Sequence, residues 1–118
     1  NGKQSRSFCY VTDLIDGMIQ LMETNDDFTG PMNLGNPNEI KIIDLAKKII
    51  DRINSKSEIY FDKLPENDPC RRKPDIALAK KIINWEPEID LEVGLSKTIE
   101  YFCSYYRNQP HYKEIEIT

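Results

Sequence analysis

Two groups of basic side chains are the residues of this sequence best suited to bind a ligand. Arg6 opens a stretch of β-forming residues, and Arg71-Arg72-Lys73 lies in a proline-rich segment just before Asp75. A guanidinium grips phosphate oxygens through two parallel hydrogen bonds, so two converging arginines would suit a diphosphate. A helix that begins at Asp75 would add backbone N–H groups nearby. The alternative is that these arginines are solvated surface charges, and composition alone favours that alternative.

Tyr10 is a further candidate for the lining of a ligand site. Phe8 and Tyr10 share one face of the strand expected at residues 5–11, with Cys9 on the other face, because strand side chains alternate. Tyr10 could therefore line a pocket or belong to the core. The core is the more common position for a single aromatic residue of a strand.

Several kinds of catalytic and metal chemistry are excluded by the residues themselves. The single histidine, His111, lies in the C-terminal tail, which removes a Ser-His-Asp triad from the folded core. The five glycines form no G-x-G-x-x-G turn. The three cysteines lack the spacing of a zinc site, and we expect free thiols in an intracellular protein. We assign no catalytic, cofactor-binding or metal-binding residue to this chain.

Length and charge restrict the class of protein further. The chain has 118 residues, enough for a single domain, and 31% of them are charged. A net charge of −4 argues against a general nucleic-acid binder. No apolar run approaches the roughly 18 residues of a membrane span. Asn1-Gly2 is a hairpin-turn pair with no strand before it, so we expect residues 1–118 to be a single truncated domain of a longer protein.

The N-terminal half predicts two strands and a helix. β-formers at 5–11 predict the first strand, and Thr12 is the expected N-cap of the following helix. Apolar residues then recur at helical spacing from Val11 to Met22, which predicts an amphipathic helix. Residues 32–34 are expected to form a short buried strand.

The C-terminal half predicts three helices and one strand. An apolar stripe over 42–53 predicts a helix, 57–61 a strand, and 64–74 a structured loop. Asp75 should cap a short helix that ends at Asn84, and Asp90 should cap the last helix. Residues 109–118 are expected to be a flexible tail. The whole pattern predicts an α/β fold with short strands and about four helices.

Four segments, in order, resemble the substrate-binding half of a known enzyme family. They are GKQSRSFCYVTDL at 2–14, NLGNP at 33–37, DPCRRKPDI at 68–76 and NWEP at 84–87. These segments are similar to extended short-chain dehydrogenases/reductases, the NAD-dependent epimerase/dehydratase family, that act on nucleotide sugars. Within the family they look most like UDP-glucuronate decarboxylases, with dTDP-glucose 4,6-dehydratases and UDP-sugar 4-epimerases as near relatives. Asn84 stands where the family usually has Gly, and both residues tolerate a left-handed backbone.

The resemblance implies roles for four residues. Arg6 would contact the nucleotide or its phosphates, and Arg72 would bind the diphosphate. Asp75 would orient that arginine or cap the adjacent helix. Tyr10 would lie near the substrate pocket. It also implies the C-terminal, substrate-binding part of a Rossmann-type fold.

The resemblance further implies a cofactor and a catalytic pair that this chain lacks. NAD would be bound by an absent N-terminal Rossmann domain, and no tyrosine here is followed four residues later by lysine, as the family's catalytic pair requires. The implied reaction oxidises UDP-glucuronate at C4, releases its carboxylate as CO2 and re-reduces the sugar to UDP-xylose. The parent would be a homodimer in the cytoplasm, or in the Golgi lumen if a membrane anchor precedes this segment. The alternative is a non-catalytic nucleotide-sugar binding module.

Overall fold

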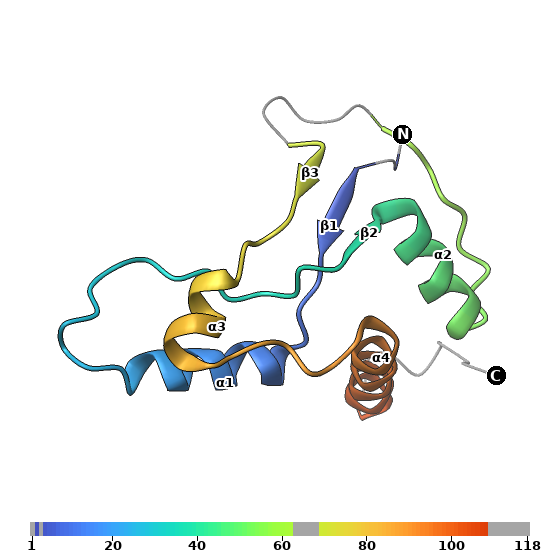
Figure 1. The fold of residues 1–118 in the computed structure, drawn as a ribbon. Helices are drawn as coiled ribbons and strands as arrows, with labels where there is room; N and C mark the ends of the chain where they lie inside the picture. The colour runs from blue at the N-terminus through green and yellow to red at the C-terminus, as the bar shows by residue number, and fades with distance from the viewer. Residues whose placement is uncertain (1, 3, 63–68, 109–118) are drawn as a thin grey trace.

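The computed structural model of the chain describes residues 2, 4–62 and 69–108 (Figure 1). Within these residues the chain forms three short strands and four helices. In chain order they are β1 (Ser5–Ser7), α1 (Val11–Met22), β2 (Glu39–Lys41), α2 (Ile42–Arg52), β3 (Arg71–Arg72), α3 (Ala77–Ile83) and α4 (Leu91–Arg107). The α/β class expected from the sequence is therefore confirmed.

The three strands form one small sheet with β1 in the middle. The order is β2-β1-β3, and β1 runs antiparallel to β2 and parallel to β3. The register sets Arg6 opposite Ile40 on one side and Arg72 on the other. This sheet brings the two arginine groups of the sequence, more than 60 residues apart, to neighbouring positions.

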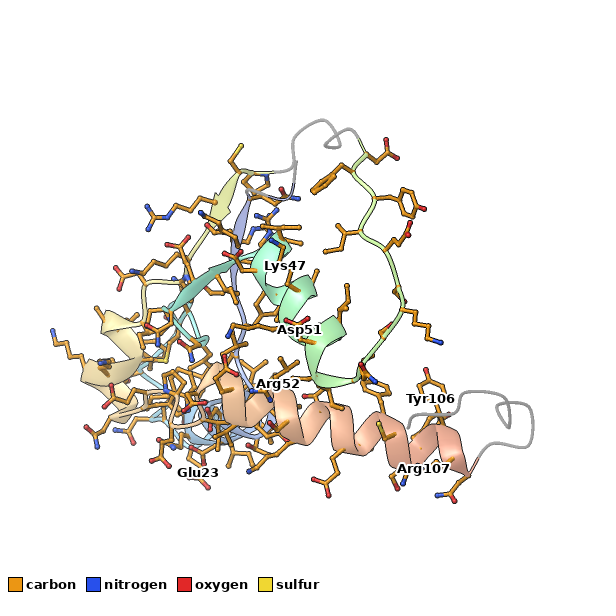
Figure 2. The ribbon with its side chains drawn as sticks, turned by 90° about the vertical axis from the view of Figure 1, so that its right-hand side faces the viewer. Glu23, Lys47, Asp51, Arg52, Tyr106 and Arg107 are labelled. Carbon is orange, nitrogen blue, oxygen red and sulfur yellow. The ribbon has the colours of Figure 1, made fainter. Side chains whose placement is uncertain are left out.

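The helices lie around one end of this sheet in two groups. α1 packs against α3, and Figure 1 shows α3 lying directly over α1. α2 and α4 are joined by polar contacts, because Lys48 and Arg52 of α2 both pair with Glu92 of α4. Figure 2 shows Arg52 at the end of α2, facing α4.

The core of the described residues is centred on Trp85, which follows α3 in the sequence and packs between α1 and α3. Trp85 is 3% exposed and packs with Ile76 and Ala79. Its indole Nε1 donates a hydrogen bond of 3.0 Å to the backbone carbonyl of Asp13 in α1. The carboxylate of Asp13 in turn accepts bonds from the backbone N–H groups of Glu88 and Ile89. Trp85 and Asp13 thus attach the segment after α3 to the first turn of α1.

Two expected helix boundaries are confirmed by their caps. Asn84 adopts the left-handed conformation, with φ 50°, and ends α3. The Asp90 side chain accepts a hydrogen bond of 2.8 Å from the backbone N–H of Val93, which caps α4. Thr12, by contrast, was expected as the cap of α1 but lies inside it, because the helix begins at Val11 and Tyr10 is the N-cap residue.

The strands differ most from the sequence expectation. The first strand ends at Ser7 instead of residue 11, and residues 32–34 and 57–61 form no strand. β3 lies instead in the segment 64–74 that was expected to be a loop, and β2 lies at residues 39–41, where no element was expected. Met32 and Leu34 pack their side chains against the Trp85 core, so the apolar run marks burial without a hydrogen-bonded partner strand. The tail expected at 109–118 lies outside the described residues.

Candidate functional site

Arg6 and Arg72 line one groove on the sheet. Their Cα atoms are register partners on the adjacent parallel strands β1 and β3. The groove has a volume of about 660 Å³, and Lys73 and Asp75 also line it. Asn33, Leu34, Gly35 and Asn36 form its other wall. The structure therefore brings together three of the four residues singled out in the sequence.

The two arginines of β3 have different surroundings. Arg71 forms a two-pronged pair with Glu39, in which Nε donates to both carboxylate oxygens at 2.9 and 2.8 Å and Nη2 donates to Oε2. Among the described residues, the side chain of Arg72 has no ion-pair partner. Side chains alternate along a strand, so Arg71 and Arg72 project to opposite faces. Arg71 is thus paired within the sheet, and Arg72 lines the groove.

The Arg71–Glu39 pair shifts the pKa values of both of its members. The hydrogen bond from Arg71, followed by that from Ser5, holds the pKa of Glu39 below its usual range. The same bond raises the pKa of Arg71. Glu39 is therefore ionised at neutral pH and neutralises Arg71. The guanidinium of Arg72 and the ammonium of Lys73 remain as positive charges at the groove.

Asp75 organises the backbone at the start of α3. Its Oδ1 accepts a hydrogen bond of 2.9 Å from the backbone N–H of Ala77. Its carbonyl accepts one of 3.2 Å from Nδ2 of Asn33 on the opposite wall of the groove. Asp75 was expected to be the cap residue of α3, but Ile76 is the N-cap, and Asp75 lies one residue before it while still accepting from a backbone N–H of the first turn. Its other suggested role, orienting Arg72, stays a prediction.

Tyr10 lies away from the arginine groove. It lines a cavity of about 190 Å³ between α2 and α4, and another of about 390 Å³ beside Tyr101 and Phe102. Its ring contacts the backbone at Gly94, where an added Cβ would lie 3.1 Å from Tyr10 Cδ2. Lys97 Nζ lies 5.5 Å from the ring centroid, a cation–π arrangement. The proposed contact of Tyr10 with substrate stays a prediction.

Sequence reasoning missed two polar residues of this region. Glu39 pairs with an arginine 32 residues later, and no local pattern signals so distant a partner. Asn36 is 5% exposed, and its Oδ1 accepts a hydrogen bond of 2.9 Å from the backbone N–H of Asn38. The Gly35-Asn36-Pro37 loop signal could have indicated this Asx turn.

The cysteines and the acidic residues suggest no further chemistry. Cys9, Cys70 and Cys103 are free thiols, and burial, followed by the charge of Asp13, raises the pKa of Cys9. Across the described parts of the chain, no three His, Cys, Asp or Glu side chains gather as a metal site would require. No helix in those parts has the length and apolar character needed to cross a bilayer.

Comparison with known proteins finds clear relatives of this chain. No family model matches the sequence. UDP-glucuronic acid decarboxylase 3 of Arabidopsis thaliana is 48% identical over 101 residues, which are 86% of this chain and 29% of that protein. UDP-glucuronic acid decarboxylase 1 of Danio rerio is 44% identical over 92% of this chain and 26% of its own length. The chain thus spans less than a third of the curated relatives it matches.

A solved structure agrees with these relatives. The UDP-glucuronic acid 4-epimerase of Bacillus cereus, in complex with UDP-glucuronic acid and NAD, matches 90% of this chain and 34% of its own. The TM-score is 0.77 and the identity 27%. The homologues are UDP-glucuronic acid decarboxylases, and the solved neighbours are NAD-dependent epimerases/dehydratases of the short-chain dehydrogenase/reductase type. The fold is that of part of a Rossmann-type epimerase/dehydratase, as the sequence motifs had predicted.

Proposed function

We propose that this chain is the UDP-glucuronate-binding portion of an NAD-dependent decarboxylase that makes UDP-xylose. In this proposal Arg6 and Arg72 contact the nucleotide diphosphate, and Asp75 orients Arg72 or caps the adjacent helix. The chain alone is inactive. Its likeness to UDP-glucuronic acid decarboxylases over 86–92% of its length supports this choice of substrate and reaction.

The observation that carries the proposal is the pairing of Arg6 with Arg72. The two residues come from distant parts of the sequence, yet they are register partners that line one groove. A diphosphate carries its negative charge on adjacent groups, which paired guanidinium forks bind through several charge-assisted hydrogen bonds. Glu39 neutralises Arg71 and leaves Arg72 in the groove, and this favours a ligand role for Arg72 over a solvated surface charge.

The catalytic groups and the cofactor site belong, in this proposal, to residues outside this chain. Its glycines do not form the turn that binds a dinucleotide, and no tyrosine has a lysine four positions later. The related epimerase is described in complex with NAD, which would supply the hydride chemistry in the parent. The exposed apolar stripe of α1 supports a further covering part, because such surfaces usually mark interaction sites.

The first experiment reads the coding sequence upstream of Asn1 and assays the complete product. We expect an open frame with a Gly-rich turn after a strand and a Tyr-x-x-x-Lys pair. The product should convert UDP-glucuronate to UDP-xylose with release of CO2. Arg72→Ala in that protein should weaken substrate binding by about 1.5–3 kcal/mol, the value of a charge-assisted hydrogen bond.

Two control variants make the Arg72 test specific. Arg72→Lys keeps the charge but loses the planar fork, so it should recover only part of the affinity. Lys81→Ala removes an exposed positive charge from α3 and should leave affinity unchanged. Unchanged affinity in Arg72→Ala, or an equal loss in Lys81→Ala, would contradict the proposed role.

Two other functions each have a specific observation in their favour. The likeness to the 27% identical 4-epimerase favours a UDP-sugar epimerase. A dTDP-glucose 4,6-dehydratase, to which no such observation points, is the related alternative of the family resemblance. In either case the assay would give an epimerised or dehydrated sugar without CO2. A non-catalytic binding module is favoured by the groove in a chain without a catalytic pair. That function requires the isolated chain to bind UDP, and calorimetry without a signal at millimolar UDP would exclude it.

Three statements about the parent stay predictions of the family resemblance. They are its homodimeric state, its cytoplasmic or Golgi compartment, and the organisation of residues 1–118 as one truncated domain. Sedimentation of the complete protein and localisation of a tagged form would test the first two.

A further inference from the structure

The carboxylate of Glu39 connects all three strands of the sheet. Glu39 lies on β2, and its Oε1 accepts a hydrogen bond of 2.7 Å from Ser5 Oγ on β1. The same carboxylate accepts the two-pronged pair from Arg71 on β3. β2 and β3 are not neighbours in the sheet, since β1 separates them. The side chains of Glu39, which is 15% exposed, and Arg71 therefore together span the full width of the sheet on one face.

The position of β3 depends on the Glu39–Arg71 pair because the strand itself makes few backbone contacts. It is two residues long, and its ladder with β1 pairs only Ser5 with Arg71 and Arg6 with Arg72. A backbone bond of 3.0 Å from Ser5 N to the carbonyl of Cys70 extends that ladder by one residue. The side chain of Arg71 is 70% exposed, so its ion pair adds little stability. Its two-pronged geometry nevertheless fixes the position and direction of β3.

We propose that Glu39 is a positioning residue for the arginine pair of the groove. It holds Arg71 on one face of β3, and this fixes Arg72 on the other face, beside Arg6. Glu39 does not line the groove, so it acts on the groove through β3. This inference rests on the proposed diphosphate role of Arg72 and adds a residue that the sequence motifs did not indicate.

The test uses Glu39→Gln in the complete enzyme that carries this segment. The amide keeps the size and one acceptor oxygen but loses the charge that holds the guanidinium. We expect KM for UDP-glucuronate to rise roughly threefold to tenfold, the effect of weakening one charge-assisted hydrogen bond. The kcat should stay unchanged, because the chemistry lies elsewhere. If Glu39 had a structural role only, the active fraction would fall, lowering kcat and leaving KM unchanged.

Two further variants test the route of the effect. Ser5→Ala removes the Ser5 bond but keeps the Arg71 pair, so it should change KM less than Glu39→Gln does. In an Arg72→Ala background, Glu39→Gln should raise KM no further, because the residue that it positions is gone. An equal additional rise in that background would overturn the inference.

The outcomes separate the inference from the proposed function. If Arg72→Ala leaves KM unchanged, the proposed function fails and the inference fails with it. If Arg72→Ala raises KM and Glu39→Gln does not, only the positioning role of Glu39 is overturned. Charge reversal gives the positive control. Glu39→Arg alone and Arg71→Glu alone should each raise KM, and the two changes combined should restore KM toward the wild-type value.

Discussion

Helix α1 has two apolar faces with opposite surroundings. On one face Gly17 is buried so closely that an added Cβ would lie 2.8 Å from Trp85 Cε2 and 3.1 Å from Leu34 Cδ2. The other face carries a stripe of exposed apolar residues, which are Val11 (55% exposed), Ile15 (50%), Met18 (52%) and Met22 (85%). A hydropathy pattern identifies both faces as apolar. Only the contacts show that one is packed and the other is not.

The difference between the faces decides what each contributes to the free energy of unfolding. Apolar surface stabilises a fold by about 25 cal/mol per Å² only when it is removed from water. Trp85 covers the Gly17 face and removes it from water. Within the described residues, the Met22 face stays exposed to water. We therefore expect substitutions on the two faces to differ strongly in their effect on this chain.

The largest effect is expected from Trp85→Ala. The indole is 3% exposed and fills the space between α1 and α3, so its removal leaves a cavity. We expect the free energy of unfolding to fall by about 3–5 kcal/mol. Urea denaturation followed by circular dichroism measures this change. Trp85→Phe is the matched control, because it keeps much of the bulk but loses the hydrogen bond to the Asp13 carbonyl, and it should cost less.

A smaller effect is expected from Asp13→Ala. The carboxylate accepts hydrogen bonds of 3.1 and 2.8 Å from the backbone N–H groups of Glu88 and Ile89, and alanine would leave both donors unpaired. We expect a loss of about 1–3 kcal/mol. Asp13→Asn keeps one acceptor oxygen and should recover part of that loss. An unchanged urea midpoint in Asp13→Ala would show that water replaces the carboxylate, and that the packed face of α1 rests on Trp85 alone.

The helices of this fold could be predicted because their signals are local. An apolar stripe located α2, Asn84 ended α3 with a left-handed residue, and Asp90 capped α4. Of the strands, only the start of β1 was predicted, because the strands are two or three residues long, too short for alternation to show. Trp85 illustrates the same limit: its place in a turn gave no sign that it forms the core, since its partners lie up to 72 residues away.

The candidate site could be predicted in part, for the same physical reason. Arg6 and Arg72 stood out because their side-chain chemistry suits phosphate wherever they lie. Their pairing depends on a strand register that no local pattern encodes. Glu39 was missed because it resembles any surface carboxylate until Arg71 and Ser5 are placed beside it. Tyr10 was singled out as a strand aromatic and by the family resemblance, yet β1 ends at Ser7 and the ring of Tyr10 lies against Gly94 of α4.

The smallest effect tests whether the outer face of α1 is truly unpacked. Met22→Gln replaces a side chain that is 85% exposed, so we expect a change within about 0.5 kcal/mol. Met32→Gln is the matched control, because the same residue type there packs against the Trp85 core, and a loss of about 1–2 kcal/mol is expected. Urea denaturation at two protein concentrations measures both. If Met22→Gln destabilised the chain as much as Met32→Gln, and more so at high concentration, the outer face would already be covered by a second copy in solution. Both faces of α1 would then be packed, the inner face against Trp85 of the same chain and the outer face against a second copy.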